Sequence, residues 1–229
     1  MNNTLRIRSL LKDISVPHHF IFKKGAYFRV IEDVAQGFHL MRKQRKGCML
    51  YNIQFSIAPL CDPKAGFYKF TFDGRDICFL IPQLFDKWPF FILDNEPDTV
   101  ERCMQEITSA CNNTLFPHFD QYHSCKCAYP DLPELKGFKG MDNYSIYFAL
   151  KNGQKESALR GIRRLMQQRQ DAYRINSQYG LQQPTEKQVA CDVEISNFYK
   201  FLEGLSDQEL ADYLQLNEQR AKEFLIGSG

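Results

Sequence analysis

The spacing of apolar residues changes along the chain from a strand-like period to a helix-like period, and this change constrains the fold most. Residues 49–57 alternate between apolar and mixed positions, which is typical of a half-buried strand. Asp73-Gly74 is a typical hairpin turn between two further candidate strands, 68–72 and 77–81. Short turns join neighbouring strands antiparallel. Earlier strand candidates are residues 20–23, 26–32 and 37–42.

Two helices accompany this predicted sheet. A short one is expected over residues 5–14. The second follows residues 94–97, whose capping oxygens and proline are typical of a helix N-terminus. We expect the second helix to lie on the sheet, with Cys103 and Cys111 as core thiols, because its apolar side chains form one stripe. The stripe consists of Val100, Cys103, Met104, Ile107 and Cys111.

Helical patterns dominate the chain after residues 118–140, which look like an irregular connection. Asn152-Gly153 predicts a helical hairpin, and Ser206 with Glu209 forms a capping box. Helices are expected over residues 144–151, 154–178 and 185–202 and from 206 onward, closing with 218–226. The sequence therefore predicts an α+β fold: an antiparallel β-meander packed with helices, followed by a C-terminal all-helical extension. The two domains are expected at residues 1–135 and 136–229.

Several short motifs of the first half form a recognisable series. They are FKKGAYFR at 22–29, DVAQGFHL at 33–40, YNIQFSI at 51–57, LIPQL at 80–84, DKW at 86–88 and LFPHF at 115–119. In this order they resemble a bacterial family, the domain of unknown function 4304, over residues of about 5–122. The resemblance implies an α+β domain. It implies no activity, because the family has no established chemistry.

The composition bears on the cellular compartment. No stretch approaches the roughly 18 consecutive apolar residues of a membrane-spanning helix, and the first residues show no secretory signal. The chain holds eight cysteines, which in a long chain without a signal are expected to be free thiols of a reducing compartment. We therefore expect a cytoplasmic protein without a membrane partner.

Charge is laid out in blocks, although the net charge is only +2. Residues 1–58 carry ten Lys and Arg against three Asp and Glu, and residues 59–135 carry six against twelve. Residues 136–180 carry nine against three, and residues 181–229 carry four against nine. Such blocks suit basic and acidic segments that face one another within the fold. They also suit a bipolar surface that meets a charged partner.

The sharpest candidate for chemistry is a cluster of His118, His123, Cys125 and Cys127. Imidazole and thiolate are the ligands that Zn²⁺ prefers, and a structural zinc site needs four of them. The Cys-x-Cys spacing is unusual for such a site, so incidental thiols in an irregular connection are the alternative. Nothing in the sequence predicts another cofactor.

Basic and aromatic residues raise a second possibility, contact with nucleic acid. The run 42–46 is basic, and one face of the predicted helix 154–178 carries Arg160, Arg163, Arg164, Gln167, Asp171 and Arg174. Tyr68, Phe70 and Phe72 could stack on bases. The alternatives are a solvated helix face and core aromatics, and they agree better with a pI near 8.1 and acidic neighbouring blocks. The single tryptophan, Trp88, suits either a partner patch or a core anchor.

No common catalytic motif occurs in the sequence: there is no phosphate-binding glycine loop, no His-Glu-x-x-His and no Gly-x-Ser-x-Gly. We therefore expect a non-catalytic binding or interaction module, and neutralisation of a protein partner is one concrete version of this role. A basic partner would be met by the acidic blocks 59–135 and 181–229, including Asp94, Glu96, Asp98 and Glu101. The alternatives are a nucleic-acid-associated protein and a zinc-containing protein, and the oligomeric state stays open.

Overall fold

The computed structural model divides the chain into two compact units. The sheet unit consists of Met1–Ala58 and Lys64–Ser124, and the helical unit of Pro59–Pro63 and Cys125–Gly229. The sequence-based boundary at residue 135 lies outside the described residues. These are residues 3–23, 25–45, 47–63, 75–77, 80–81, 91–94, 98–130, 143–181 and 183–227.

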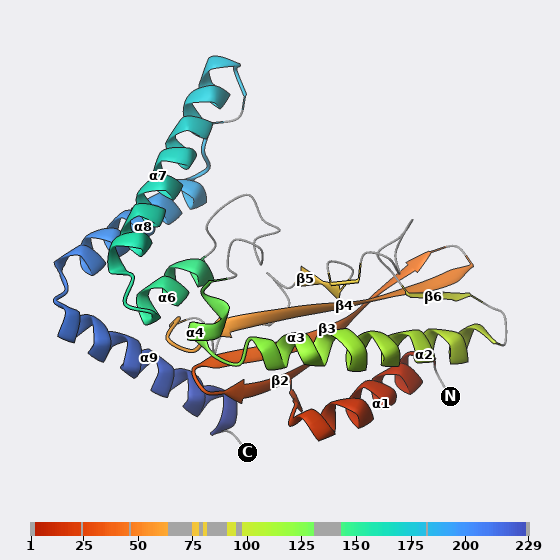
Figure 1. The fold of residues 1–229 in the computed structure, drawn as a ribbon. Coiled ribbons are helices and arrows are strands. Elements are labelled where there is room, and N and C mark those ends of the chain that lie inside the picture. The colour runs from red at the N-terminus through yellow and green to blue at the C-terminus, as the bar shows by residue number, and fades with distance from the viewer. Residues whose placement is uncertain are drawn as a thin grey trace. The chain divides into compact units, whose positions relative to one another are not determined.

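An antiparallel sheet forms the centre of the sheet unit (Figure 1). Its strands follow the order β1-β2-β3-β4-β5, and β6 also pairs with β4. Tyr27 of β2 lies opposite Phe38 of β3, and Tyr51 of β4 lies opposite Phe91 of β6. The predicted β-meander is therefore confirmed. The strands are β1 (Ile21–Lys23), β2 (Ala26–Ile31), β3 (Val34–Arg45), β4 (Cys48–Pro59), β5 (Arg75–Asp76) and β6 (Phe91–Asp94).

The last part of the sheet differs from the prediction. The strand expected at 77–81 is wrong for the residues described there, because β5 ends at Asp76. The backbone N–H of Leu80 donates to the carbonyl of Ile77 at 2.9 Å, so the chain turns on itself instead of pairing with β4. Ile77 is fully buried in the core. The candidate strand 68–72 and the turn at 73–74 lie outside the described residues.

Helices pack on one face of this sheet (Figure 1). They are α1 (Asn3–Ser15), the short η1 (Val16–His18), α2 (Thr99–Ala110), the π-helical turn η4 (Cys111–Leu115) and α3 (Phe116–Gln121). The predicted apolar stripe of α2 lies in the core, with Cys103 and Cys111 fully buried. Their burial confirms that they are core groups, and it raises the pKa of both thiols to about 12.

The segment after α2 is more helical than expected. The interpretation of 118–140 as irregular is wrong for residues 118–121, which belong to α3, and for α4 (Cys125–Ala128). Pro117 does not end the helix, because it stands in the first turn of α3 after the π-helical turn. A first-turn proline lacks only an N–H that has no partner within the helix. The start of α2 also differs: Asp98 is its N-cap and makes no side-chain capping hydrogen bond.

A buried arginine connects β2 to its neighbours. Arg29 is only 7% exposed, and its Nε donates to Gln36 Oε1 at 2.7 Å. Its Nη1 donates to the His18 carbonyl at 3.0 Å, and its Nη2 donates to Asp120 Oδ1 at 2.6 Å. The guanidinium also lies over the ring of Phe20. Arg29 thereby holds β3, η1 and α3 around one strand.

Gln36 continues this buried polar network on β3. Its side chain is fully buried, and its Nε2 donates to the carbonyls of Phe119 and Tyr122 at 2.6 and 3.0 Å. These carbonyls lie at the end of α3, where a helix leaves backbone acceptors without intrahelical partners. Gln36 therefore caps α3 from the sheet.

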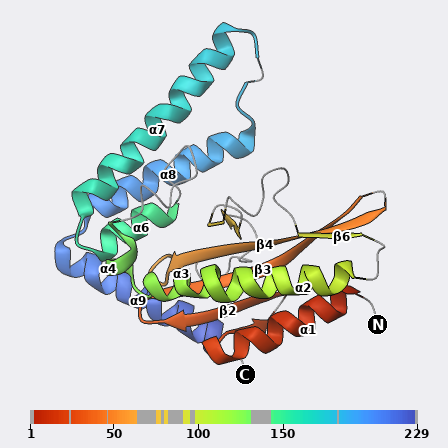
Figure 2. The ribbon, with the colours of Figure 1, turned by 45° about the vertical axis from the view of Figure 1, so that its right-hand side comes forward.

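The helical unit contains α4, α6 (Asn143–Lys151), α7 (Lys155–Gln178), α8 (Glu186–Gly204) and α9 (Asp207–Ile226). Figure 2 shows α7 and α8 as a long antiparallel hairpin. The predicted helices 144–151, 154–178 and 185–202 are confirmed within two residues, and the expected last helix is continuous from Asp207 to Ile226. Thr185 and Ser206 both form capping boxes. None of the helices that the structure describes is long and apolar enough to cross a membrane.

Candidate interaction surface

The two predicted zinc-binding histidines lie in and just after α3, and each has other contacts. The ring of His118 packs edge-on against Phe55, with centroids 5.3 Å apart. The Nδ1 atom of His123 lies 3.0 Å from the carbonyl oxygen of Asp120, and its Nε2 atom lies 3.6 Å from a carboxylate oxygen of Glu32. Both rings are therefore held by groups of the sheet unit.

The two predicted zinc-binding cysteines belong to α4, in the helical unit. Cys125 is buried, and Cys127 is half-buried. Across the ranges that the structure describes, no group of three or more His, Cys, Asp or Glu side chains could hold a metal ion. A zinc site at His118, His123, Cys125 and Cys127 therefore stays a prediction of the sequence alone.

Two arginines of α7 face α8 and pair there with carboxylates. The Nε of Arg163 donates to the Tyr199 hydroxyl at 2.5 Å, and its Nη2 lies 3.4 Å from Glu203 Oε1. Arg169 pairs with Asp192. These contacts lie along one edge of the seam between α7 and α8, where a carboxylate offsets the charge of each arginine.

The other arginines of the predicted basic face, Arg160, Arg164 and Arg174, are exposed. Arg174 pairs with Asp171 on the same helix at 3.1 Å, and Arg160 donates to a serine hydroxyl. Arg164 has no ion-pair partner among the described residues. Gln167 is exposed as well. Three arginines of α7 are thus paired with carboxylates, which weakens the case for a phosphate-binding helix.

Other sequence candidates are scattered or lie outside the described residues. Residues 42–45 are exposed at the end of β3. Asp98 is exposed, whereas Glu101 pairs with Arg6 at 2.6 Å. Asp94 ends β6. The candidates outside the described residues are Lys46, Tyr68, Phe70, Phe72, Trp88 and Glu96.

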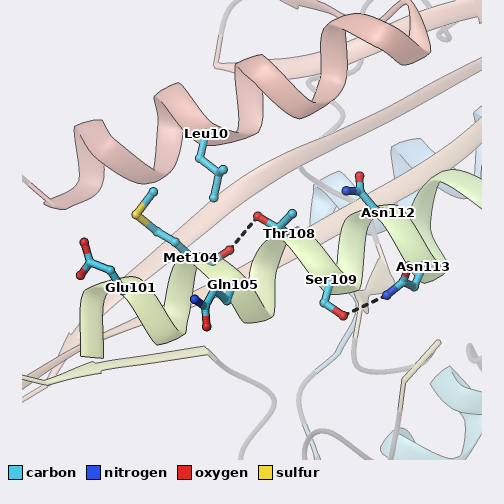
Figure 3. A pocket seen from close by; sticks show the side chains of 8 residues that line it. All are labelled: Leu10, Glu101, Met104, Gln105, Thr108, Ser109, Asn112 and Asn113. Carbon is cyan, nitrogen blue, oxygen red and sulfur yellow. Dashed lines mark hydrogen bonds between the residues drawn. The ribbon is translucent and has the colours of Figure 1, made fainter. Parts of the chain in front are cut away.

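A shallow groove of about 530 Å³ runs between α1 and α2 (Figure 3). Leu10 of α1 and Met104 of α2 lie toward each other across it. Its polar lining is uncharged except for Glu101, and Thr108 bonds to the backbone of its own helix. Asn113 likewise donates to a serine one turn earlier. The groove therefore presents no charged or reactive group that is not already engaged locally.

The sheet carries two buried polar side chains on the face opposite the helices. His39 of β3 is 7% exposed and Asn52 of β4 is 3% exposed, and His39 Nδ1 and Asn52 Oδ1 have no hydrogen-bond partner among the residues that the structure describes. Gln54 donates to Asp76 beside them at 2.9 Å. Burial lowers the pKa of His39, and the nearby carboxylate of Asp76 opposes this shift. His39 is consequently neutral in the folded chain at pH 7.

The α7–α8 hairpin exposes several large apolar side chains, among them Ile175, Tyr179, Val189, Val193 and Phe201. From Arg163 to Phe201 the described residues include no buried side chain. Ile175 is 47% exposed and Tyr179 is 76% exposed. They end a row of exposed residues at helical spacing, which we call the α7 stripe: Arg164, Gln168, Ala172, Ile175 and Tyr179.

A matching row follows α8. This α8 stripe consists of Glu186, Ala190, Glu194, Asn197 and Phe201, all exposed. In each helix, stripe residues come one position earlier in the sequence than residues that lie between α7 and α8. Gln168 precedes Arg169 in this way, and Glu194 precedes Ile195. In an antiparallel pair of right-handed helices, this shared offset puts both stripes on the same side of the hairpin. Together the two stripes form one surface, the hairpin surface.

Sequence reasoning did not single out this surface. The stripe mixes arginine, glutamine, alanine and only two large apolar residues, so no strong apolar period marks it. The available signal was the recurrence of apolar residues at i and i+4 near the hairpin tip. Ile175 and Tyr179 have this spacing, and they are 47% and 76% exposed.

Comparisons with known proteins identify no relative. No family model, no curated protein and no solved structure matches the chain. The resemblance to family 4304 therefore stays a prediction. The class defined by the fold is an α+β unit joined to a helical unit with an exposed helical hairpin.

Proposed function

We propose that this protein is a non-catalytic interaction module that binds a protein partner through the hairpin surface. The observation that carries the proposal is the exposure of large apolar side chains along a hairpin whose described residues from Arg163 to Phe201 include no buried side chain. Exposed apolar rows on paired helices are typical of protein contacts. Tyrosine, the most exposed residue of the surface, is common among residues that dominate binding energy.

The proposal favours protein over nucleic acid because three arginines of α7 are already paired with carboxylates. It keeps the expectation of a cytoplasmic protein, and the seven cysteines that the structure describes are free thiols. Neutralisation of a partner, the more specific expectation, would follow if the bound partner lost an activity.

The test is purification of the full chain from its own cells, followed by native mass spectrometry. Tyr179→Glu places a charge at the most exposed residue of the α7 stripe, and Val16→Glu is the matched control because Val16 is 59% exposed in the sheet unit. We expect an added protein mass with the natural chain and with Val16→Glu, and its loss with Tyr179→Glu. An unchanged complex in all three, added nucleic acid instead of protein, or no complex at all would contradict the proposal.

A further inference from the structure

We infer that the hairpin surface binds a second copy of this chain, forming a four-helix bundle from two α7–α8 hairpins. This inference rests on the proposed function and names the partner. Two packed helices leave their outer sides open, and a bundle of four buries them around a common core. Because all ten residues of the α7 and α8 stripes are exposed, the described residues leave room for another hairpin on that side.

The charges of the hairpin select a bipolar partner. On the hairpin surface itself, the α7 stripe carries one basic residue, Arg164, whereas the α8 stripe carries two acidic ones, Glu186 and Glu194. An acidic partner would suit α7 and be repelled by α8, and a basic partner would do the reverse. A second hairpin of this chain satisfies both helices when its α8 lies on α7.

Two-fold symmetry allows this contact to occur twice. In a two-fold dimer the same patch serves both copies, so residue i contacts residue j and residue j contacts residue i. Arg164 of the α7 stripe and Glu194 of the α8 stripe have no ion-pair partner among the described residues. The ion pairs Arg163–Glu203 and Arg169–Asp192 join α7 to α8 on either side of these two residues. Measured along the hairpin axis, Arg164 and Glu194 therefore lie within about one helical turn, roughly 5 Å, of each other. The dimer therefore brings Arg164 of one copy beside Glu194 of the second copy.

The apolar residues of the stripes lie on both sides of this charge pair. Ile175 and Tyr179 lie toward the hairpin tip from Arg164, and they face Ala190 of the second copy in this arrangement. Small residues such as Ala172 and Ala190 let two helices approach closely. The apolar contacts supply most of the affinity, and the charges set the pairing of α7 with α8.

The size of the surface sets the expected strength. From Arg163 to Gln178, α7 is about 24 Å long, and two packed helices are about 20 Å wide. One side of the hairpin thus offers on the order of 500 Å², and two copies bury about 1,000 Å², which is near the lower limit of a specific interface. We therefore expect a reversible dimer with a dissociation constant roughly in the micromolar range.

Sedimentation equilibrium of the purified full chain from about 1 to 200 µM tests the inference, a range chosen around the expected constant. Ile175→Glu should weaken the dimer more than about tenfold, because each dimer would bury that charge twice. Arg164→Glu and Glu194→Arg should each weaken it by about three- to tenfold. The double variant should restore it, because the reversed charges attract again. Val16→Glu is the control that should leave the constant unchanged.

The outcomes separate this inference from the proposed function. A purified chain that stays monomeric at 200 µM would overturn the second-copy inference. A dimer whose dissociation constant is unchanged by Ile175→Glu, Arg164→Glu and Glu194→Arg would also overturn it. A complex with a different protein that Tyr179→Glu abolishes would also overturn it and would leave the proposed function intact. Failure of the double charge swap to restore a dimer that each single swap weakens would overturn the pairing of α7 with α8.

Discussion

Replacing Arg29 by methionine removes the buried guanidinium while keeping an unbranched apolar stem. The fully buried Gln36 then loses the donor to its Oε1 atom, and the His18 carbonyl loses another. A buried acceptor without a partner costs about 1–3 kcal/mol. The lost ion pair with Asp120 adds little, because that carboxylate side chain is 57% exposed. We expect Arg29→Met to lower the free energy of unfolding of the sheet unit by about 2–4 kcal/mol.

The assay should report on the sheet unit alone, because two units can unfold separately. Alkylation of the buried thiols Cys103 and Cys111 across a urea series, located by mass spectrometry, meets this need. Arg6→Met is the matched control, since Arg6 pairs only with an exposed glutamate on the surface, and it should shift the midpoint little. Equal midpoints for Arg29→Met and Arg6→Met would refute the reasoning that the buried network stabilises the sheet.

Adding Gln36→Leu refines this prediction. Gln36→Leu removes the Oε1 acceptor that Arg29→Met leaves without a donor. It also removes the Nε2 donor to two carbonyls at the end of α3. In a double-mutant cycle, the two substitutions together should therefore cost less than the sum of the single costs, by about 1 kcal/mol or more. Additive costs would show that Arg29 and Gln36 act independently.

Three further predictions concern the stability and chemistry of single residues. Thr185→Ala removes the capping box of α8 and should lower the stability of the helical unit by about 1 kcal/mol, measured by urea unfolding. The pKa of His39 in the folded chain lies below its ordinary 6.5, so as the pH falls the unfolded chain binds a proton at His39 before the folded chain does. Stability should consequently fall as the pH drops below about 6.5, and His39→Gln should flatten that slope between pH 7 and pH 5; an identical slope would contradict the assignment. Iodoacetamide at pH 8 should modify half-buried Cys191 well before fully buried Cys111 in the native chain, and equal rates would contradict the burial.

Local patterns predicted the regular elements well. The alternation at 49–57 lies within β4, and the apolar stripe of α2 packs on the sheet as expected. The capping box at Ser206 and the hairpin at Asn152-Gly153 were also found where the sequence placed them. These features depend on neighbours within one turn or on one face, so the residues themselves carry the information.

Elements that depend on distant partners were not predictable in the same way. Strands β5 and β6 are two and four residues long and owe their form to pairing with β4, which leaves no period of their own. Ile77 belongs to an apolar run that suited a strand, but its backbone forms a local turn. Residues 118–121 looked irregular, yet they belong to α3, which follows the π-helical turn directly and holds Pro117 in its first turn.

The interaction surface escaped sequence analysis for a related reason. The arginines of α7 were interpreted as one solvated face, yet Arg163 and Arg169 turn to carboxylates of α8 that lie more than 20 residues further along the chain. The α7 stripe can be recognised once Arg163 and Arg169 are known to contact α8. The exposure of Ile175 and Tyr179 then follows from packing, which the sequence does not display.

The most direct test of the hairpin surface as the contact site is site-specific photo-crosslinking of the full chain in its own cells. Benzoylphenylalanine at position 179 replaces an exposed tyrosine of the α7 stripe, and the same probe at Gln170 reports the other side of α7. The account predicts a cross-linked product from position 179, of twice the mass of the chain if the second-copy inference holds, and none from position 170. Equal products from both positions, or none from position 179, would contradict it.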